Sequence, residues 1–464
     1  MKKFLSREKN EEKIQKKLNF NHIISRSIIF ILLNIVVEIF MWKRISFDFQ
    51  LKTNLVVLFT WIFLIELIFS FKRLYKLHPF NYWSAFLTPL IANILFNLFI
   101  FKNINIFSVS SVMSVLIITM LIDYESGILS SLIFGIYFGI IYGFDIRYMF
   151  IIFVPGIITA LIARNIKRRI EILLPFFVST AIQAFLTITF VVGNDFDLIL
   201  PLIISNFFSV IFAMGILPFF EYATRVYSDI GLLELGNLNH PLIKKLSLKA
   251  PGTYYHSMII ANLAESAVEY VGGNHVLVRV GAYFHDIGKI WKPTFFTENQ
   301  KTENPHTNIS PKLSSLILNN HVSYGKEIAE KNRLPILIED MIMQHQGTRV
   351  KQFFYKKYYD QTGIQDVDMF KYPGPIPQFK ESAILMICDV TEAITRSITD
   401  LTPNTLNEKL DELIQSLFME GQFDDCGLKL KEIQKIKGRI IRTVMEMNHK
   451  RIAYPKIAKK ELKG

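Results

Sequence analysis

Histidines beside acidic, amide or hydroxyl residues are the side chains of this sequence whose types and spacing could do chemistry. Eight of the ten histidines follow residue 220, and three of these lie in the strings Tyr255-His256-Ser257, His285-Asp286 and Gln344-His345-Gln346. Imidazole and carboxylate together suit iron, manganese or zinc, and the two oxygens of one carboxylate can bridge two ions. Taken singly, each histidine is more often a packed or capping residue than a ligand. Their clustering predicts a metal site.

The elements that must position these residues are helices. After residue 220, apolar residues recur with helical spacing in runs such as 257–271, 276–283, 310–318 and 406–418, between loops that contain Pro and Gly. Strand signals are nearly absent. The sequence therefore predicts an all-α cytoplasmic domain at 251–455, preceded by a helical or looped connector at 221–250 and followed by a basic tail at 456–464.

The preceding part of the chain is predicted to be a helical membrane domain at 24–220, after a basic cytoplasmic N-terminus at 1–23. A hydrophobic content of 51% with 40 Phe is too apolar for a wholly soluble protein of 464 residues. Apolar runs indicate about eight spans, several of them slightly shorter than the ~20 residues that cross a bilayer. The spans are expected near 24–42, 53–71, 84–101, 106–122, 127–143, 147–163, 172–193 and 198–219.

The formal charge of +12 is expected to face anionic lipid rather than nucleic acid, because many basic residues flank apolar runs. The basic N-terminus and the loops at 72–76 and 164–169 favour a cytoplasmic position for both termini, by the positive-inside rule. Only two cysteines occur, Cys388 and Cys426, so a disulfide framework is excluded. These features predict a multi-pass protein of a bacterial plasma membrane.

The string Gly281-Ala-Tyr-Phe-His-Asp-Ile-Gly-Lys289 resembles the signature turn of the HD phosphohydrolase superfamily. Its surroundings resemble the membrane-bound seven-transmembrane HD family that hydrolyses cyclic di-AMP. The matching motifs lie at 232–241, 250–257, 297–300, 303–306, 344–348, 372–378 and 389–393, and the resemblance covers essentially all of residues 107–455.

This resemblance implies two divalent metal ions, which the family generally supplies as iron or manganese. The implied ligands of the first ion are His256, His285, Asp286 and Asp389. Asp286 would bridge to a second ion, which His321 and His345 would also hold.

Further residues carry roles by the same resemblance. Asp286 and Lys289 are the expected catalytic residues, and Lys289 and Arg396 are expected to contact phosphate, with surface solvation as the alternative. Three more residues are expected to bind substrate, with loop capping as the alternative for the first two: Asn304, His306 and Thr348.

The sequence departs from the family pattern in two places. Only about ten residues, 43–52, join the first two expected spans, where family members carry a large extracytoplasmic domain. Gln346 stands where the family has a second consecutive histidine. An amide oxygen binds these metals more weakly than imidazole, so Gln346 is expected to be a weak ligand and to weaken the second site.

The expected activity is a metal-dependent hydrolysis of cyclic di-AMP to linear pApA, in which an activated water attacks phosphorus in line with the leaving 3′-oxygen. Two alternatives stay open: a receptor whose HD domain binds nucleotide with little or no turnover, and an HD phosphohydrolase acting on another nucleotide. The expected partners are the cyclic dinucleotide and the lipid bilayer, and a homodimer stays open.

Overall fold

The computed structural model describes residue 75 and residues 77–100, 109–141, 145–192, 197, 199–300 and 303–448. The chain divides into two compact units, Met1–Gly231 and Leu232–Gly464, and the division falls inside the connector predicted at 221–250. Outside the described residues lie the expected spans at 24–42 and 53–71, the loop at 43–52, the basic N-terminus at 1–23 and the whole basic tail at 456–464.

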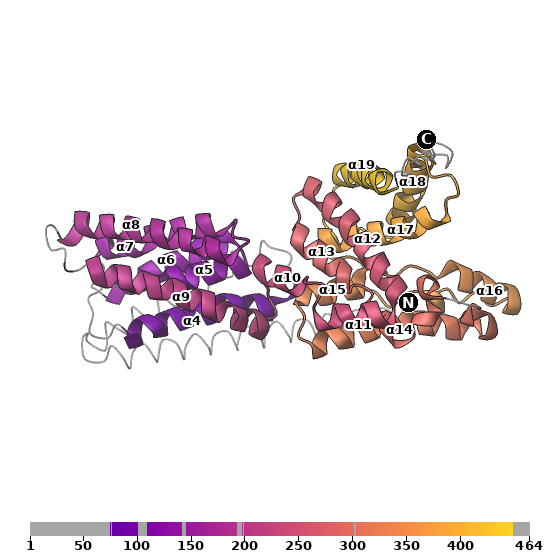
Figure 1. The fold of residues 1–464 in the computed structure, drawn as a ribbon, viewed down its shortest axis with the longest axis horizontal. Helices are drawn as coiled ribbons and strands as arrows, with labels where there is room; N and C mark the ends of the chain where they lie inside the picture. The colour runs from indigo at the N-terminus through magenta and orange to yellow at the C-terminus, as the bar shows by residue number, and fades with distance from the viewer. Residues whose placement is uncertain are drawn as a thin grey trace, which may run out of the picture. The chain divides into compact units, whose positions relative to one another are not determined.

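The described part of the first unit is a bundle of helices that fall on the six remaining expected spans (Figure 1). Three of its helical stretches are long and apolar enough to cross a membrane: Ile146–Ala163, Arg169–Val191 and Ile199–Thr224. Helix α5 has only 10 residues, fewer than the ~20 that span a bilayer. The helices are α4 (Pro79–Ile100), α5 (Val112–Leu121), α6 (Tyr124–Ile141), α7 (Ile146–Ala163), α8 (Leu173–Thr187) and α9 (Ile199–Thr224).

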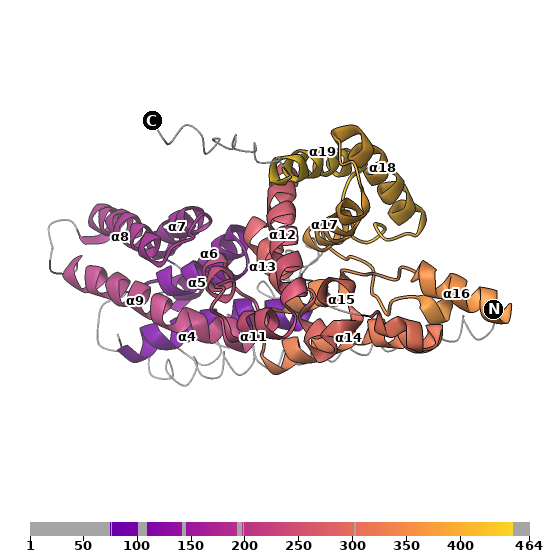
Figure 2. The same ribbon diagram turned by 45° about the vertical axis from the view of Figure 1, so that its right-hand side comes forward.

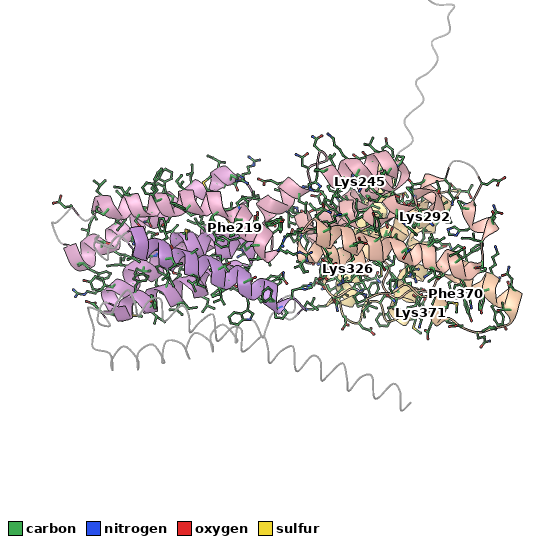
Figure 3. All side chains as sticks on the ribbon, turned by 90° about the horizontal axis from the view of Figure 1, so that it is seen from below. Phe219, Lys245, Lys292, Lys326, Phe370 and Lys371 are labelled. Atoms are coloured by element: carbon green, nitrogen blue, oxygen red, sulfur yellow. The ribbon has the colours of Figure 1, made fainter. Side chains whose placement is uncertain are left out.

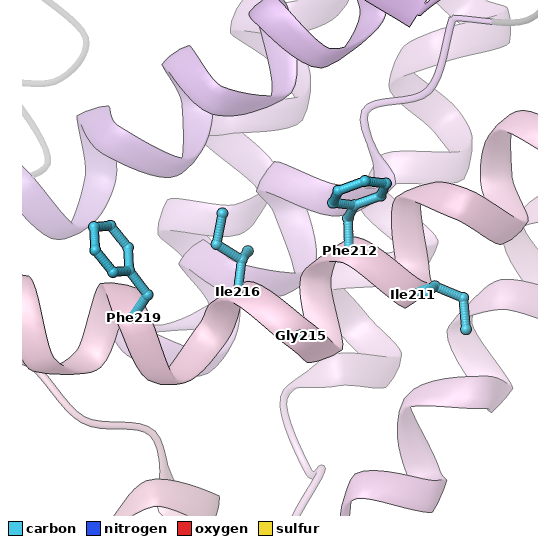
Figure 4. A pocket seen from close by; sticks show the side chains of 5 residues that line it. All are labelled: Ile211, Phe212, Gly215, Ile216 and Phe219. Carbon is cyan, nitrogen blue, oxygen red and sulfur yellow. The ribbon is translucent and has the colours of Figure 1, made fainter.

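The outer surface of this bundle is apolar. The rings of Phe177, Phe185 and Phe219 are 63%, 67% and 64% exposed. On α9, Phe212 and Phe219 border an open apolar pocket of about 630 Å³ (Figure 4). Contiguous exposed apolar surface of this kind is costly in water and matches the hydrocarbon of a bilayer.

The interior of the bundle contains hydrogen-bonded polar side chains. Asn206 lies at its centre, where its Nδ2 donates to Gln183 Oε1 at 2.8 Å and its Oδ1 accepts from Ser110 Oγ at 2.5 Å. Asn97 Nδ2 donates to the Ser110 carbonyl at 3.1 Å. These bonds connect α4, the segment before α5, α8 and α9. Buried polar contacts hold helices together where lipid supplies no hydrophobic driving force between them.

The described residues of the second unit are helical and contain no strand, which confirms the all-α prediction. An isolated bridge between Val350 and Lys371 pairs two loops. Its main helices are α11 (Pro241–Lys249), α12 (Pro251–Val268), α13 (His275–Phe284), α14 (Pro311–Lys331), α15 (Ile336–Gln344), α16 (Gln352–Thr362), α17 (Lys380–Ser397), α18 (Pro403–Met419) and α19 (Leu430–Met447).

Capping residues fix where two of the site-bearing helices begin. Asn274 accepts a hydrogen bond from the Leu277 amide at 2.9 Å at the start of α13. Ser310 accepts from the Leu313 amide at 3.3 Å at the start of α14, and Pro311 occupies the first helical position. Such caps satisfy amides that have no partner inside the helix.

The centre of the second unit is formed by α12, α13, α15 and α17 (Figure 2). Its surface carries lysines: Lys245, Lys292 and Lys371 are exposed, and Figure 3 labels all three on this unit. The unit therefore buries apolar side chains and carries most of its charges outside, and the cluster described next is one of the buried exceptions.

A close backbone contact joins α14 to the short 3-10 helix η6 (Ile287–Trp291), which follows α13. A Cβ added to Gly288 would lie 1.8 Å from the His321 carbonyl oxygen and 2.7 Å from the Gly325 amide nitrogen. Only glycine permits this approach. The contact brings the His285-Asp286 turn and His321, 35 residues later in the chain, into one site.

Candidate metal centre

Six histidine and aspartate side chains meet at the centre of the second unit, and all six are buried. Each comes from a different position on the core helices. The six are His256 on α12, His285 and Asp286 at the end of α13, His321 on α14, His345 at the end of α15 and Asp389 on α17.

The two oxygens of Asp286 face different histidines. Oδ2 lies 3.1 Å from His285 Nε2 and 3.6 Å from His256 Nε2. Oδ1 lies 3.4 Å from His321 Nε2 and 3.5 Å from His345 Nε2. A carboxylate between two pairs of imidazole nitrogens has the arrangement that bridges two metal ions.

Asp389 completes the first group of donors. Its Oδ1 lies 3.0 Å from His256 Nε2 and 4.0 Å from His285 Nε2. Two sets of donor atoms are close enough to hold an ion: His256 with His285 and Asp389, and Asp286 with His285 and His345. His321 Nε2 lies 3.2 Å from His345 Nε2 and so adjoins the second set.

The unsatisfied polar atoms of this cluster fit a metal. Among the described residues, His285 Nε2 and both carboxylate oxygens of Asp286 are buried with no hydrogen-bond partner, and Oδ2 forms an ion pair with the Lys289 ammonium at 2.7 Å. Buried polar atoms without partners are rare in folded proteins. Imidazole nitrogens mixed with carboxylate oxygens are donors that suit iron, manganese or zinc.

The opposite nitrogens of three histidines are held by their own chain. Nδ1 of His285, His321 and His345 each lies at hydrogen-bond distance from the carbonyl oxygen three residues earlier, and the bonds of His285 and His345 are both 2.8 Å long. A carbonyl only accepts, so each Nδ1 carries the proton and Nε2 is left with its lone pair toward the cluster.

The electrostatics of the cluster agree with this arrangement. Burial lowers the pKa of His321 to about 3, so its ring stays neutral. Burial opposes charge on His256 as well, but Asp389 and Glu392 raise its pKa to about 9. Burial would raise the pKa of Asp286, but Lys289 and His285 lower it well below its usual value. Asp286 therefore carries its negative charge, while the neutral ring of His321 can offer a nitrogen to a cation.

Lys289 lies at the edge of the cluster with most of its side chain covered, which disfavours the surface-solvation alternative. Its side chain is 11% exposed, and its ammonium lies 2.7 Å from Asp286 Oδ2 and 2.8 Å from Glu298 Oε1. Glu298 also accepts from Thr253 Oγ1 at 2.9 Å. Lys289 thus holds Asp286 ionised, and its contact with phosphate stays a prediction.

Gln346 lies beside the first group of donors. Its Nε2 donates to Asp389 Oδ2 at 3.0 Å. In this orientation the amide supports a candidate ligand of the first ion, whereas the sequence predicted a weak ligand of the second.

Three of the residues predicted to bind substrate contact groups other than the six candidate ligands. Asn304 caps the short helix Pro305–Asn308 through the His306 amide at 3.0 Å, and His306 Nε2 lies 3.0 Å from the Phe295 carbonyl oxygen. Thr348 exchanges hydrogen bonds with Gln422. Neither Asn304, His306 nor Thr348 bonds to the six candidate ligands among the described residues, so the capping alternative has the better support for Asn304.

Two carboxylates of the site, Glu298 and Glu392, were missed from the sequence. Glu392 Oε2 lies 2.8 Å from His256 Nδ1, and Glu392 Oε1 lies 2.5 Å from Arg396 Nη2. Glu392 follows Asp389 by three residues, which places both on one face of α17. That spacing is the signal that could have identified it.

Comparisons with known proteins agree with the division of the chain. Residues 22–228 match the family described as a 7TM receptor with intracellular HD hydrolase, and residues 253–394 match the HD domain. The chain is 40% identical over 259 residues to cyclic-di-AMP phosphodiesterase PgpH of Bacillus subtilis, covering 56% of this chain and 36% of that protein. It is 37% identical over 314 residues to PgpH of Listeria monocytogenes, covering 66% and 44%.

A solved structure is similar as well. The crystal structure of the L. monocytogenes PgpH HD domain in complex with cyclic-di-AMP is 42% identical, with a TM-score of 0.45, and the match covers 46% of this chain and all of that one. The chain spans less than half the length of the two PgpH proteins. The chain is therefore similar to 7TM receptors with an intracellular HD hydrolase over residues 22–228 and to HD domains over residues 253–394.

Proposed function

We propose that the chain is a membrane-anchored, metal-dependent phosphodiesterase that hydrolyses a cyclic dinucleotide, with cyclic di-AMP as the substrate and linear pApA as the product. The observation that carries this proposal is Asp286, whose Oδ2 faces His256 and His285 while its Oδ1 faces His321 and His345. The choice of substrate is supported by the names of the two PgpH relatives.

The proposed ligands follow from the two donor groups. The first ion would be held by His256, His285, Asp286 and Asp389. The second would be held by Asp286, His321 and His345. The family resemblance favours iron or manganese. When bound, two such ions supply an activated water and neutralise charge on the phosphate oxygens.

The protein's own groups have separate parts in this proposal. Lys289 keeps Asp286 charged between the two histidine pairs. Arg396 binds Glu392 through Nε and Nη2, yet its side chain is 47% exposed. One edge of the guanidinium therefore remains available for a substrate phosphate, which a planar cation with several donors binds well.

The membrane unit would hold this domain at the cytoplasmic face of a bacterial plasma membrane, with both termini cytoplasmic. The support is the apolar outer surface of α7, α8 and α9 and the distribution of basic loops. A partner other than lipid and the cyclic dinucleotide is not required by the site.

The test is hydrolysis by the full chain, purified in detergent and loaded with manganese or iron. It would be incubated with cyclic di-AMP, cyclic di-GMP and cyclic mononucleotides, and the products separated by chromatography. We expect conversion of cyclic di-AMP to pApA that stops when a chelator is added. If only another nucleotide is hydrolysed, the proposed substrate is wrong but the chain is still a phosphodiesterase.

The receptor alternative is favoured by one observation, the amide of Gln346 where the family has a second histidine. It predicts that the same preparation binds cyclic dinucleotide but does not hydrolyse it at any metal concentration. Equilibrium binding measured beside turnover separates the two functions.

A further inference from the structure

His256 differs from the other three candidate histidine ligands in how its second nitrogen is held. Nδ1 of His285, His321 and His345 faces a carbonyl oxygen of its own helical segment, three residues earlier. Nδ1 of His256 instead lies 2.8 Å from Glu392 Oε2, which is 136 residues away in the chain. The orientation of this one ring therefore depends on a side chain of another helix.

The contact determines which nitrogen of His256 is available to a metal. A carboxylate accepts hydrogen bonds and cannot donate them, so Nδ1 carries the proton. Nε2 then faces the cluster, where Asp389 Oδ1 lies at 3.0 Å and Asp286 Oδ2 at 3.6 Å, and it is the nitrogen that would bind a metal.

Burial and charge show that Glu392 is more than a partner within α17. Its side chain is 4% exposed, whereas that of Arg396 is 47% exposed. A surface ion pair four residues apart on a helix does not require a buried carboxylate. The second oxygen of Glu392 is directed at His256, and Arg396 compensates the buried charge from outside. The result is a chain from Arg396 through Glu392 and His256 to the first donor group.

We propose that Glu392 is a positioning residue that fixes the ring of His256 and makes its Nε2 a stronger ligand for the first ion, with Arg396 as its ion-pair partner on the exposed side. The inference rests on the proposed function, since it takes His256 as a ligand. Carboxylates that accept from a metal-bound histidine orient it and raise its basicity, and their loss typically reduces metal affinity by about 10–100-fold.

The experiment measures metal binding directly rather than turnover. The full chain in detergent would be stripped of metal and titrated with Mn²⁺, with free Mn²⁺ followed by electron paramagnetic resonance. Glu392→Gln retains the size and an accepting oxygen but removes the charge. We expect Glu392→Gln to lower the affinity for one of the two Mn²⁺ ions by about 10-fold. Glu392→Ala should lower the same affinity by up to about 100-fold.

Glu381→Gln is the matched control. Glu381 is on the same helix as Glu392 and accepts a hydrogen bond from the Asn274 amide at 2.7 Å. Asn274 is not one of the candidate ligands. We expect Glu381→Gln to leave both Mn²⁺ affinities within about 2-fold of the parent, because the candidate ligands and their hydrogen-bond partners are unchanged. Thermal unfolding of every variant in chelator establishes that α17 is folded.

Two outcomes would overturn the inference. Parental Mn²⁺ affinity in both Glu392 variants would mean that His256 is held without Glu392. An equal loss in Glu381→Gln would mean that any disturbance of α17 loosens the site. If the parent chain itself binds no Mn²⁺ at the cluster, the proposed function fails as well, and the two failures are thereby distinguished.

Discussion

The amide of Gln346 donates a hydrogen bond to Asp389, from Nε2 to Oδ2 at 3.0 Å. The family resemblance places a metal-binding histidine at this position. The amide thus touches a candidate ligand of the first ion, while the second ion would rely on Asp286, His321 and His345. The second site therefore has one imidazole ligand fewer than the family pattern provides.

Gln346→His should strengthen the second site, because it adds a nitrogen ligand beside His345. We expect its Mn²⁺ affinity there to rise by about 10-fold, the usual effect of one tuned ligand interaction. Metal titration followed by activity and bound-metal analysis measures this. Gln352→His adds an imidazole at an exposed position on α16 and should change neither the metal dependence of the activity nor the amount of bound metal. Equal stoichiometry and metal dependence in parent and Gln346→His would show that Gln346 suffices or never contacts the metal.

Asp286→Ala should abolish binding of both ions and hydrolysis together, since its two oxygens face both histidine pairs. The fold should survive, because Lys289 keeps Glu298 as an ion-pair partner. Bound metal after gel filtration, turnover and circular dichroism are the three measurements. Asp360→Ala on the surface of α16 is the control. Near-parental turnover in Asp286→Ala would mean that the His285-Asp286 pair is structural.

The sequence predicted the helical class and the candidate ligands because both depend on local patterns. Helical spacing after residue 220 and the apolar runs before it were sufficient for the class. The six candidate ligands came from motifs in which the neighbours of each histidine or aspartate are informative, and the structure brings all six together. Their ligation of metal stays a prediction.

Contacts between distant parts of the chain were not predictable in the same way. Lys289 was expected to face either phosphate or solvent, yet it pairs with Glu298, nine residues later and on another short helix. Glu392 was passed over because its partner His256 is 136 residues away. A single sequence contains no record of such pairings, so only the spacing of Glu392 from Asp389 could have suggested one.

Gly288→Ala should damage both the fold and the metal site. Its Cβ would lie 1.8 Å from the His321 carbonyl oxygen, so η6 and α14 must separate. We expect a loss of about 1–3 kcal/mol in the free energy of unfolding, as for other overpacked cores, together with weaker binding of the second ion. Thermal unfolding and Mn²⁺ titration test both.

The matched control for Gly288 is Gly438→Ala. Gly438 lies within α19, and no atom lies within 4 Å of its added Cβ. Alanine there should stabilise the helix by about 0.5–1 kcal/mol. If Gly288→Ala behaved like Gly438→Ala, the close contact between η6 and α14 would not exist in solution.

Both termini should be cytoplasmic. The basic N-terminus and the loop at 164–169 favour the cytoplasm, and an even number of spans places the two ends on one side. Reporter fusions after residues 5 and 460, one enzyme active only in the cytoplasm and one only outside it, measure the side of each end. Opposite sides would require an odd number of spans.

Lys351 should make stability depend on pH. It is buried, with its ammonium 2.7 Å from Asn319 Oδ1 and 4.0 Å above the centre of the Tyr372 ring, and no carboxylate of the described residues pairs with it. Burial lowers its pKa from 10.5 to about 7, so between these values the unfolded chain binds more protons than the folded one. The free energy of unfolding must then rise with pH in that window, and the cost of burying the charged ammonium is fully present below it.

Lys351→Met lacks this pH-dependent cost. The difference in Tm between Lys351→Met and the parent should therefore shift against the variant from pH 7 to pH 9, whereas exposed Lys245→Met should show a constant difference. A constant difference for both would mean that Lys351 stays charged throughout.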